Sequence, residues 1–207
     1  MMMTALARTR AVRIACLVAP LLLMAVSVAG HPKPAAVPYR WQLEFKPGDL
    51  RVWVNPRDDK PYWYFTYTVT NRTGQEQVWA PVFTMLTDAG EIMTSGENVP
   101  ADVTSTLKAL LANDLLETQT EVIGELLQGK EHAKDGLVIW PMPTTDLTDI
   151  SIFVRGLSGE TAKVKNPSTK KDVVLHKTLK RDYLIPGNAL DRGSKAVELV
   201  SEQWIFR

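Results

Sequence analysis

The chain has little cysteine and little net charge, and each shortage excludes a class of protein. Cys16 is its only cysteine, which excludes an intramolecular disulfide scaffold and a cysteine-rich zinc site. The 24 Lys+Arg and 23 Asp+Glu nearly cancel, which excludes a globally basic nucleic-acid binder. With 45% apolar residues the chain is not a disordered one, and 207 residues support one sizeable domain.

Sequence motifs of common enzyme classes are also missing. The chain has no Gly-x-Ser-x-Gly elbow, no Gly-x-Gly-x-x-Gly or Walker loop, and no His-Glu-x-x-His pair. These patterns supply a nucleophile, a phosphate cradle and a metal site respectively. We therefore predict a protein that is not an enzyme and that needs no cofactor or metal.

The amino-terminal segment has the pattern of an export signal. Residues 1–13 carry three arginines and no acid, and residues 14–28 are almost entirely apolar. Because a spanning helix needs about 20 apolar residues, this run of about 15 is too short to be an anchor. Small residues favour cleavage after Ala29, with cleavage after Gly30 as the alternative. We expect a periplasmic or secreted protein with no transmembrane helix after cleavage.

Removal of the signal peptide, residues 1–29, changes the charge balance. The segment contains three of the 24 basic residues and none of the 23 acidic ones, so the mature chain has 21 against 23, a net charge of −2. It also loses its only cysteine, which suits an oxidising compartment. Three prolines in residues 30–38 predict an extended tether, and residues 39–207 are predicted to form a single domain.

Alternation of apolar and polar residues predicts a mainly β domain. The strongest signal is residues 62–70, which are all aromatic, Thr or Val. Helical spacing of leucines predicts one inserted helix at about 100–117, and residues 129–136 read as a polar loop. We predict a β-sandwich that ends in a long hairpin. Its expected strands are residues 39–46, 50–55, 62–70, 76–87, 91–94, 137–140, 150–155, 172–179 and 197–206.

Parity along residues 62–70 assigns each side chain to a face. Trp63, Phe65, Tyr67 and Val69 share one parity and are predicted to lie in the core. The tyrosines on the other parity are expected to face outward.

Three segments carry a resemblance to a known group of domains. They are residues 64–74, which end in Val-Thr-Asn-Arg-Thr-Gly, residues 86–90, which contain Asp-Ala-Gly, and residues 124–141, which end in Val-Ile-Trp-Pro. In this order they resemble the immunoglobulin-like extracytoplasmic domains of bacterial secreted proteins of unknown function. The resemblance covers roughly residues 62–155. It implies an immunoglobulin-like antiparallel sandwich and no catalytic residues.

Positive charge is concentrated near the carboxyl end, where Asp172 is the only acid in residues 163–181. An anionic partner, such as an acidic glycan or lipid head groups, is one interpretation. The other is a solvated hairpin whose lysines discourage aggregation. Nucleic acid is not favoured because no aromatic residues interrupt the basic stretch. The predicted anionic-ligand surface consists of Lys163, Lys165, Lys170, Lys171, Lys177, Lys180 and Arg181.

The leading hypothesis is a non-enzymatic binding or accessory protein whose partner is an envelope protein or an anionic glycan. One alternative is a carbohydrate-binding module that presents Tyr62, Tyr64 and Trp53 to sugar rings. The other is a copper protein. If cleavage follows Gly30, the amine and ring of His31 could chelate copper as a brace, with either of two further histidines as third ligand. Those two residues are His132 and His176.

Overall fold

The structure is a computed structural model that describes residues 31–207, which consist mainly of strands with one α-helix. The predicted signal peptide, residues 1–29, lies outside the described residues. Residues 31–38 of the predicted tether contain no helix or strand. Internal contacts group Pro32–Arg207 into one unit. No helix in the described part of the chain is long and apolar enough to span a membrane.

The first sheet is built around β3 (Pro61–Asn71), whose aromatic and β-branched residues favour extended backbone. Strands β1 and β2 pair with one edge of β3, and β9 pairs with the other; all three are antiparallel to it. The two-residue β7 adds a parallel edge beyond β9. These neighbours are β1 (Glu44–Pro47), β2 (Arg51–Val54), β7 (Leu116–Glu117) and β9 (Gly129–Pro141).

The second sheet is built around β12 (Asp172–Leu184). The first half of β12 pairs with β11, and its second half lies between β10 and β13. Beyond β10 the sheet continues through β5 to β6. Its strands are β5 (Val82–Thr87), β6 (Ile92–Thr94), β10 (Asp149–Arg155), β11 (Thr161–Lys165) and β13 (Glu198–Phe206), while β4 (Gln77–Trp79) and β8 (Gly124–Leu126) form a separate pair.

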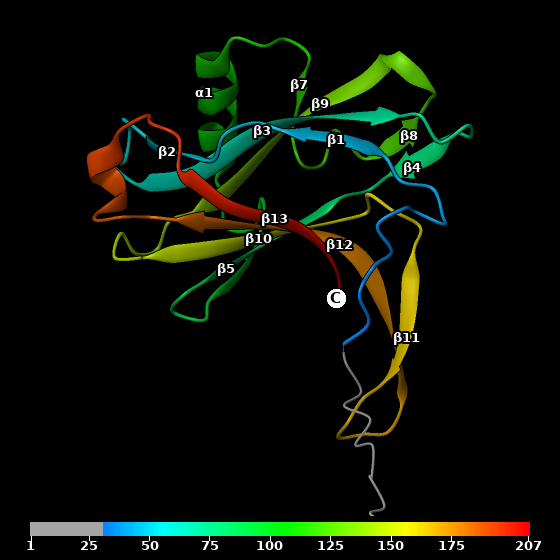
Figure 1. The fold of residues 1–207 in the computed structure, drawn as a ribbon. Coiled ribbons are helices and arrows are strands. Elements are labelled where there is room, and N and C mark those ends of the chain that lie inside the picture. The colour runs from blue at the N-terminus through cyan, green and yellow to red at the C-terminus, as the bar shows by residue number, and fades with distance from the viewer. Residues whose placement is uncertain (1–30) are drawn as a thin grey trace, which may run out of the picture. The chain divides into compact units, whose positions relative to one another are not determined.

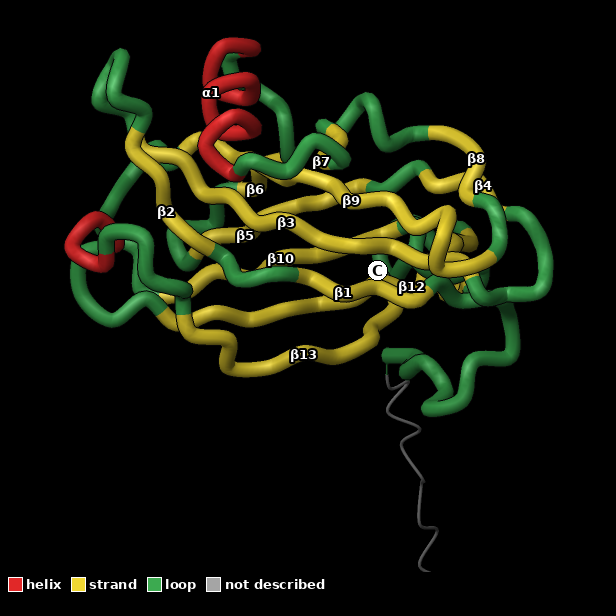
Figure 2. The backbone as a smooth tube through the Cα atoms, turned by 90° about the horizontal axis from the view of Figure 1, so that it is seen from above, coloured by secondary structure: helices red, strands yellow, loops and turns green. Residues whose placement is uncertain are grey.

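The main core lies between these two sheets. Phe65 of β3 and Phe83 of β5 meet edge to face, with ring centroids 5.8 Å apart. Trp63, Phe65 and Trp140 are fully buried, and the predicted inward face of β3 is confirmed. Figure 2 shows the strands of both sheets running in nearly the same direction, as in aligned sheet packing.

Two predicted boundaries around the core are wrong. Residues 129–136 are not a loop but the first part of β9, in which Gly136 stands opposite Tyr67. A Cβ on Gly136 would lie 2.2 Å from the Tyr67 ring, so glycine is needed there to admit the ring. The strand expected at 39–46 begins only at Glu44. Before it, Leu43 donates to the carbonyl of Leu157, on the second sheet's side.

The helix α1 (Ala101–Leu111) covers the outer face of the first sheet and is shorter than predicted. Figure 1 shows α1 and β7 on the side of β3 and β9 that faces away from β10 and β12. The helix ends because Ala112 adopts the left-handed conformation, with φ of 49°. Leu116, expected on the helix, lies instead in β7 and is buried. A second apolar cluster therefore forms between α1 and the sheet.

Candidate functional site: the groove beside the helix

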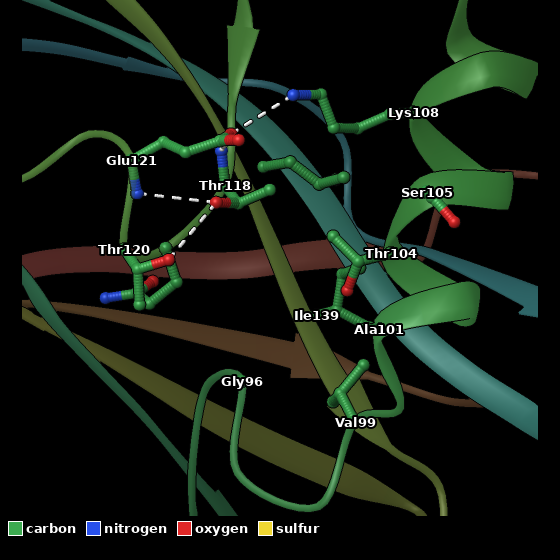
Figure 3. Close-up of a pocket in the computed structure, with 12 residues that line it drawn as sticks. Gly96, Val99, Ala101, Thr104, Ser105, Lys108, Thr118, Thr120, Glu121 and Ile139 are labelled. Carbon is green, nitrogen blue, oxygen red and sulfur yellow. Dashed lines mark hydrogen bonds and ion pairs between the residues drawn. The ribbon is translucent and has the colours of Figure 1, made fainter.

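A groove of about 540 Å³ opens between α1 and residues 118–121 (Figure 3). Leu137 and Ile139 of β9 form its floor together with Val99. Both β9 residues point away from the main core, because inward-facing positions alternate with them along the strand. The volume falls within the range of small-molecule sites in proteins. The groove is therefore the candidate functional site.

One wall of the groove is a side of α1. Val103 and Leu107 are fully buried against the sheet and fix the rotation of the helix. Helical geometry then directs Ala101, Thr104 and Lys108 sideways into the groove rather than toward the sheet or solvent. Figure 3 shows Thr104 beside Ile139 of the floor.

The opposite wall is a turn that is anchored to the core of the protein. The Val122 amide donates to the Thr118 carbonyl at 3.1 Å, and the Val122 side chain is fully buried in the main core. Gln119 anchors the turn further, because its Nε2 donates to the Pro81 carbonyl at 3.1 Å. Both walls are thus fixed to the body of the protein.

An ion pair bridges the two walls at one end of the groove. Lys108 Nζ lies 3.1 Å from Glu121 Oε2, and the Thr118 amide donates to the same oxygen at 2.8 Å. The hydrogen bond from this amide, followed by that from Lys108, lowers the pKa of Glu121. The side chains are 30% and 54% exposed, and exposed pairs of this kind contribute only about 0–1 kcal/mol. A ligand anion can therefore replace Glu121 as the partner of Lys108 at little cost.

Hydroxyl groups line the walls between the ion pair and the apolar floor. Thr118 Oγ1 lies 3.4 Å from Thr120 Oγ1 and accepts from the Glu121 amide at 3.3 Å. Ser105 Oγ donates to the Asp102 carbonyl at 3.0 Å. These contacts are made within each wall, and none of the residues lining the groove is a histidine or cysteine. The arrangement can bind a molecule that has one apolar face and polar groups above it.

The expected aromatic platform is covered by the same helix. Tyr62 and Tyr64 do face away from the main core, but they are only 2% and 8% exposed because α1 packs over them. Trp53 packs against this cluster and is half-buried. The prediction that the two tyrosines present their rings to solvent is wrong, since sequence parity cannot show a third layer.

The predicted basic surface is divided by the structure. Lys177 is 1% exposed and pairs with Glu160, and Arg181 is 6% exposed and pairs with Glu202 through Nε at 2.8 Å. Lys180 is half-buried and contacts Asp182 at 2.8 Å. Each of these three side chains is therefore paired with a carboxylate of the same chain. The remaining exposed members are Lys163, Lys165, Lys170 and Lys171.

The histidines of the copper hypothesis lie on different elements. His132 is exposed on β9 of the first sheet, and His176 is exposed on β12 of the second. His31 precedes the first strand. Across residues 31–207 no group of three or more His, Cys, Asp or Glu side chains is placed to hold a metal ion.

A buried ion pair lies at one end of the main core, where the segment before β1 crosses the second sheet. Lys177 Nζ donates to Glu160 Oε1 at 3.0 Å, and the Tyr39 amide donates to the same oxygen at 3.2 Å. Lys177 Nζ also lies 5.1 Å from the ring of Trp204. Glu160 is fully buried, and its Oε2 has no hydrogen-bond partner. The pair places two opposite charges inside the core, where both side chains are enclosed and not accessible to a ligand.

Sequence reasoning did not find the groove, although one signal pointed toward it. Residues 137–140 are apolar on both parities, which is typical of a strand covered on both faces. The same is true of residues 62–65. Only the tertiary structure shows which segment covers the second face of these strands, and where a groove forms beside that segment.

Comparisons with models of known protein families, with curated protein sequences and with solved structures gave no match.

Proposed function

We propose that this protein is an extracytoplasmic, non-enzymatic binding protein that takes a small amphipathic anion in the groove beside α1. The observation that carries this proposal is the groove itself, in which an apolar floor meets a lysine at one end. An acyl or similar apolar group would lie on Leu137 and Ile139. Its carboxylate would pair with Lys108 and displace Glu121.

The residues of the groove support binding rather than chemistry. Lys108 and Glu121 are its only charged lining residues, and they are paired with each other. The wall hydroxyls contact groups of their own segments and no general base. Pockets that bind small molecules are typically of this kind, apolar with a few placed polar groups. Export through a cleaved signal peptide is part of the proposal and is supported by the pattern of residues 1–29.

We also propose that the sandwich is of the immunoglobulin-like type. Its adjacency supports this, since β1, β3 and β9 are neighbours in one sheet and β5, β10 and β12 in the other. These neighbours correspond to strands A, B, E and C, F, G of the immunoglobulin fold. The helix α1 and strand β13 are additions to that plan. Such sandwiches carry their functions on inserted segments and loops, as the groove does here.

A titration with sodium octanoate, followed by two-dimensional amide NMR, tests the proposal. Binding should shift the amides of residues 104–108 and 118–121, and octanol, which has the same chain without the charge, should bind more weakly. Thr104→Tyr fills the groove and should abolish the shifts. Ala109→Tyr places the same ring on an exposed part of α1 outside the groove and is the matched control.

The charge of Lys108 is tested by two further variants. Lys108→Gln should weaken octanoate at least fivefold and leave octanol unchanged, whereas Glu121→Gln frees Lys108 and should tighten octanoate. Equal octanoate binding by the Thr104→Tyr and Ala109→Tyr variants would show that the groove is not the site.

A further inference from the structure

Two arginines lie together on the outer face of the second sheet, where sequence reasoning placed no site. Arg155 ends β10, on the parity that faces away from the core, and Arg207 follows β13. The Arg207 backbone exchanges two hydrogen bonds with His176 of β12, at 2.8 and 3.0 Å. Its guanidinium carbon lies 4.0 Å from the ring centroid of Phe153. Phe153 and Arg155 are two residues apart on β10, so the ring holds the Arg207 guanidinium on the face that carries Arg155.

Neither Arg155 nor Arg207 forms an ion pair with a carboxylate of residues 31–207. Burial, followed by the charge of Arg155, lowers the pKa of Arg207. The two like charges repel each other, and an anion bound between them would relieve this repulsion. A planar fork fixed on an aromatic ring is the geometry that binds sulfate and carboxylate groups in two-point contact.

Further cations continue the same face along the β11–β12 hairpin. His176 of β12 stands opposite Thr161 of β11. Lys163 lies two residues after Thr161 on β11, so these three residues share one face. Lys165 follows on that face, about 7 Å further along the strand. Asp172 stands opposite Lys165 and offsets its charge in part.

Among the other carboxylates of this face, Asp149 and Glu198 stand at its far end, opposite Leu184, and Asp182 is already occupied. It accepts from Ser151 Oγ at 2.6 Å and from Ser201 Oγ at 2.7 Å, and it pairs with Lys180. The line from the two arginines to Lys163 is therefore net positive. It crosses the second sheet onto the hairpin, which Figure 1 shows extending away from the two layers.

We propose that this face binds a linear acidic polysaccharide, with one sulfate or carboxylate group held between Arg155 and Arg207 and the next groups along Lys163 and Lys165. A linear row of cations matches a linear polyanion. Single-stranded nucleic acid is disfavoured because Phe153, the aromatic residue of the cluster, is only 7% exposed under Arg207 and offers no ring for stacking. A membrane is disfavoured because the hairpin ends in Asn-Pro-Ser-Thr, without apolar residues to insert.

Two double variants that remove equal charge test this proposal. Arg155→Gln with Arg207→Gln removes the fork, while Lys170→Gln with Lys171→Gln removes two charges from the turn of the hairpin, outside the row. Affinities for heparin and for polygalacturonate are measured by calorimetry at 0.05 and 0.2 M salt, with single-stranded DNA and phosphatidylserine vesicles as comparison ligands.

The arginine variant should bind at least tenfold more weakly, because each charge-assisted contact contributes about that factor. The turn variant should lose less than threefold. Arg155→Lys with Arg207→Lys keeps the charge but not the fork and should lie between. Unchanged melting temperatures of the variants show that folding is intact, and Lys163→Gln with Lys165→Gln provides a second test on the same face.

Equal losses in the arginine and turn variants would overturn the proposal, because net charge alone would then explain binding. Tighter binding of DNA or vesicles than of either polysaccharide, with the same dependence on the arginines, would overturn the assignment of the partner. The result is independent of the groove, since octanoate binding should be the same in all these variants.

Discussion

Removing Lys177 should destabilise the protein strongly, although the sequence places it in a run of surface lysines. The side chain is 1% exposed and is the charged partner of Glu160, which is fully buried. Lys177→Met keeps the length and apolar stem but leaves the carboxylate with only the Tyr39 amide, 3.2 Å away. Breaking a buried pair from one side costs about 3–5 kcal/mol, because the remaining charge stays out of water.

That loss is a large part of the stability of a domain, which is typically about 5–15 kcal/mol. With an m-value of about 2 kcal/mol/M in urea, the midpoint should fall by about 2 M. The melting temperature should fall by about 6–20 °C for a domain of this size. Urea unfolding followed by tryptophan fluorescence and circular dichroism measures both quantities.

The double variant Glu160→Met with Lys177→Met decides between a charge effect and a packing effect. Replacing both partners by apolar side chains of similar volume leaves no charge behind, so its stability should return to within about 2 kcal/mol of wild type. The reasoning is refuted if Lys177→Met costs less than about 1 kcal/mol. It is also refuted if the double variant loses as much stability as Lys177→Met and Glu160→Met lose together when each is measured alone. Lys177→Met should also leave heparin binding unchanged, because the amine never reaches the surface.

Three further predictions concern the core, the acid side of the stability curve and export. Phe65→Ala should lower the free energy of unfolding by about 3–5 kcal/mol, because the ring is fully buried between the sheets. Thr66→Ala changes a half-buried residue on the opposite face and should cost much less. Equal losses in urea unfolding would show that the faces are misassigned. Burial raises the pKa of Asp182, but hydrogen bonds from Lys180, Ser151 and Ser201 outweigh it and lower the pKa overall. This carboxylate therefore stabilises the fold fully above about pH 4, and its contribution is lost as pH falls through its folded pKa. Asp182→Asn should reduce the decline in the free energy of unfolding between about pH 5 and pH 2. An unchanged decline would contradict the assignment. Intact-mass measurement on exported protein should find a chain that begins at Gly30 or His31, and retention of residues 1–29 would disprove the cleaved signal.

Local pattern determined much of the sandwich from the sequence alone. The alternation in residues 62–70 assigned Trp63, Phe65 and Tyr67 to the core because side chains in a strand point to opposite faces at every step. The expected strand at 76–87 is divided in the structure into β4 and β5 at Pro81, which cannot donate to a ladder. These are properties of a few neighbouring residues, so no knowledge of the rest of the chain was needed.

Contacts between distant segments decided what the sequence could not. Gly129–Gly136 has the composition of a loop, but its backbone is held as strand β9 by pairing with β3, which lies some sixty residues earlier. The leucines of residues 107–116 fit a single helix, yet Leu116 pairs with Asp135 in a strand once Ala112 ends the helix. Pattern gives periodicity, whereas pairing partners depend on the whole chain.

The sites depend on the tertiary structure almost entirely. The sequence grouped seven basic residues by their nearness along the chain, and folding buried or paired Lys177, Lys180 and Arg181. It brought Arg155 and Arg207, 52 positions apart in sequence, to one face instead. In the same way α1 covered Tyr62 and Tyr64 and left a groove beside them. The sequence determined which chemical groups the chain carries, but which of them share a surface, and which are buried, was decided only when the sheets and helix packed together.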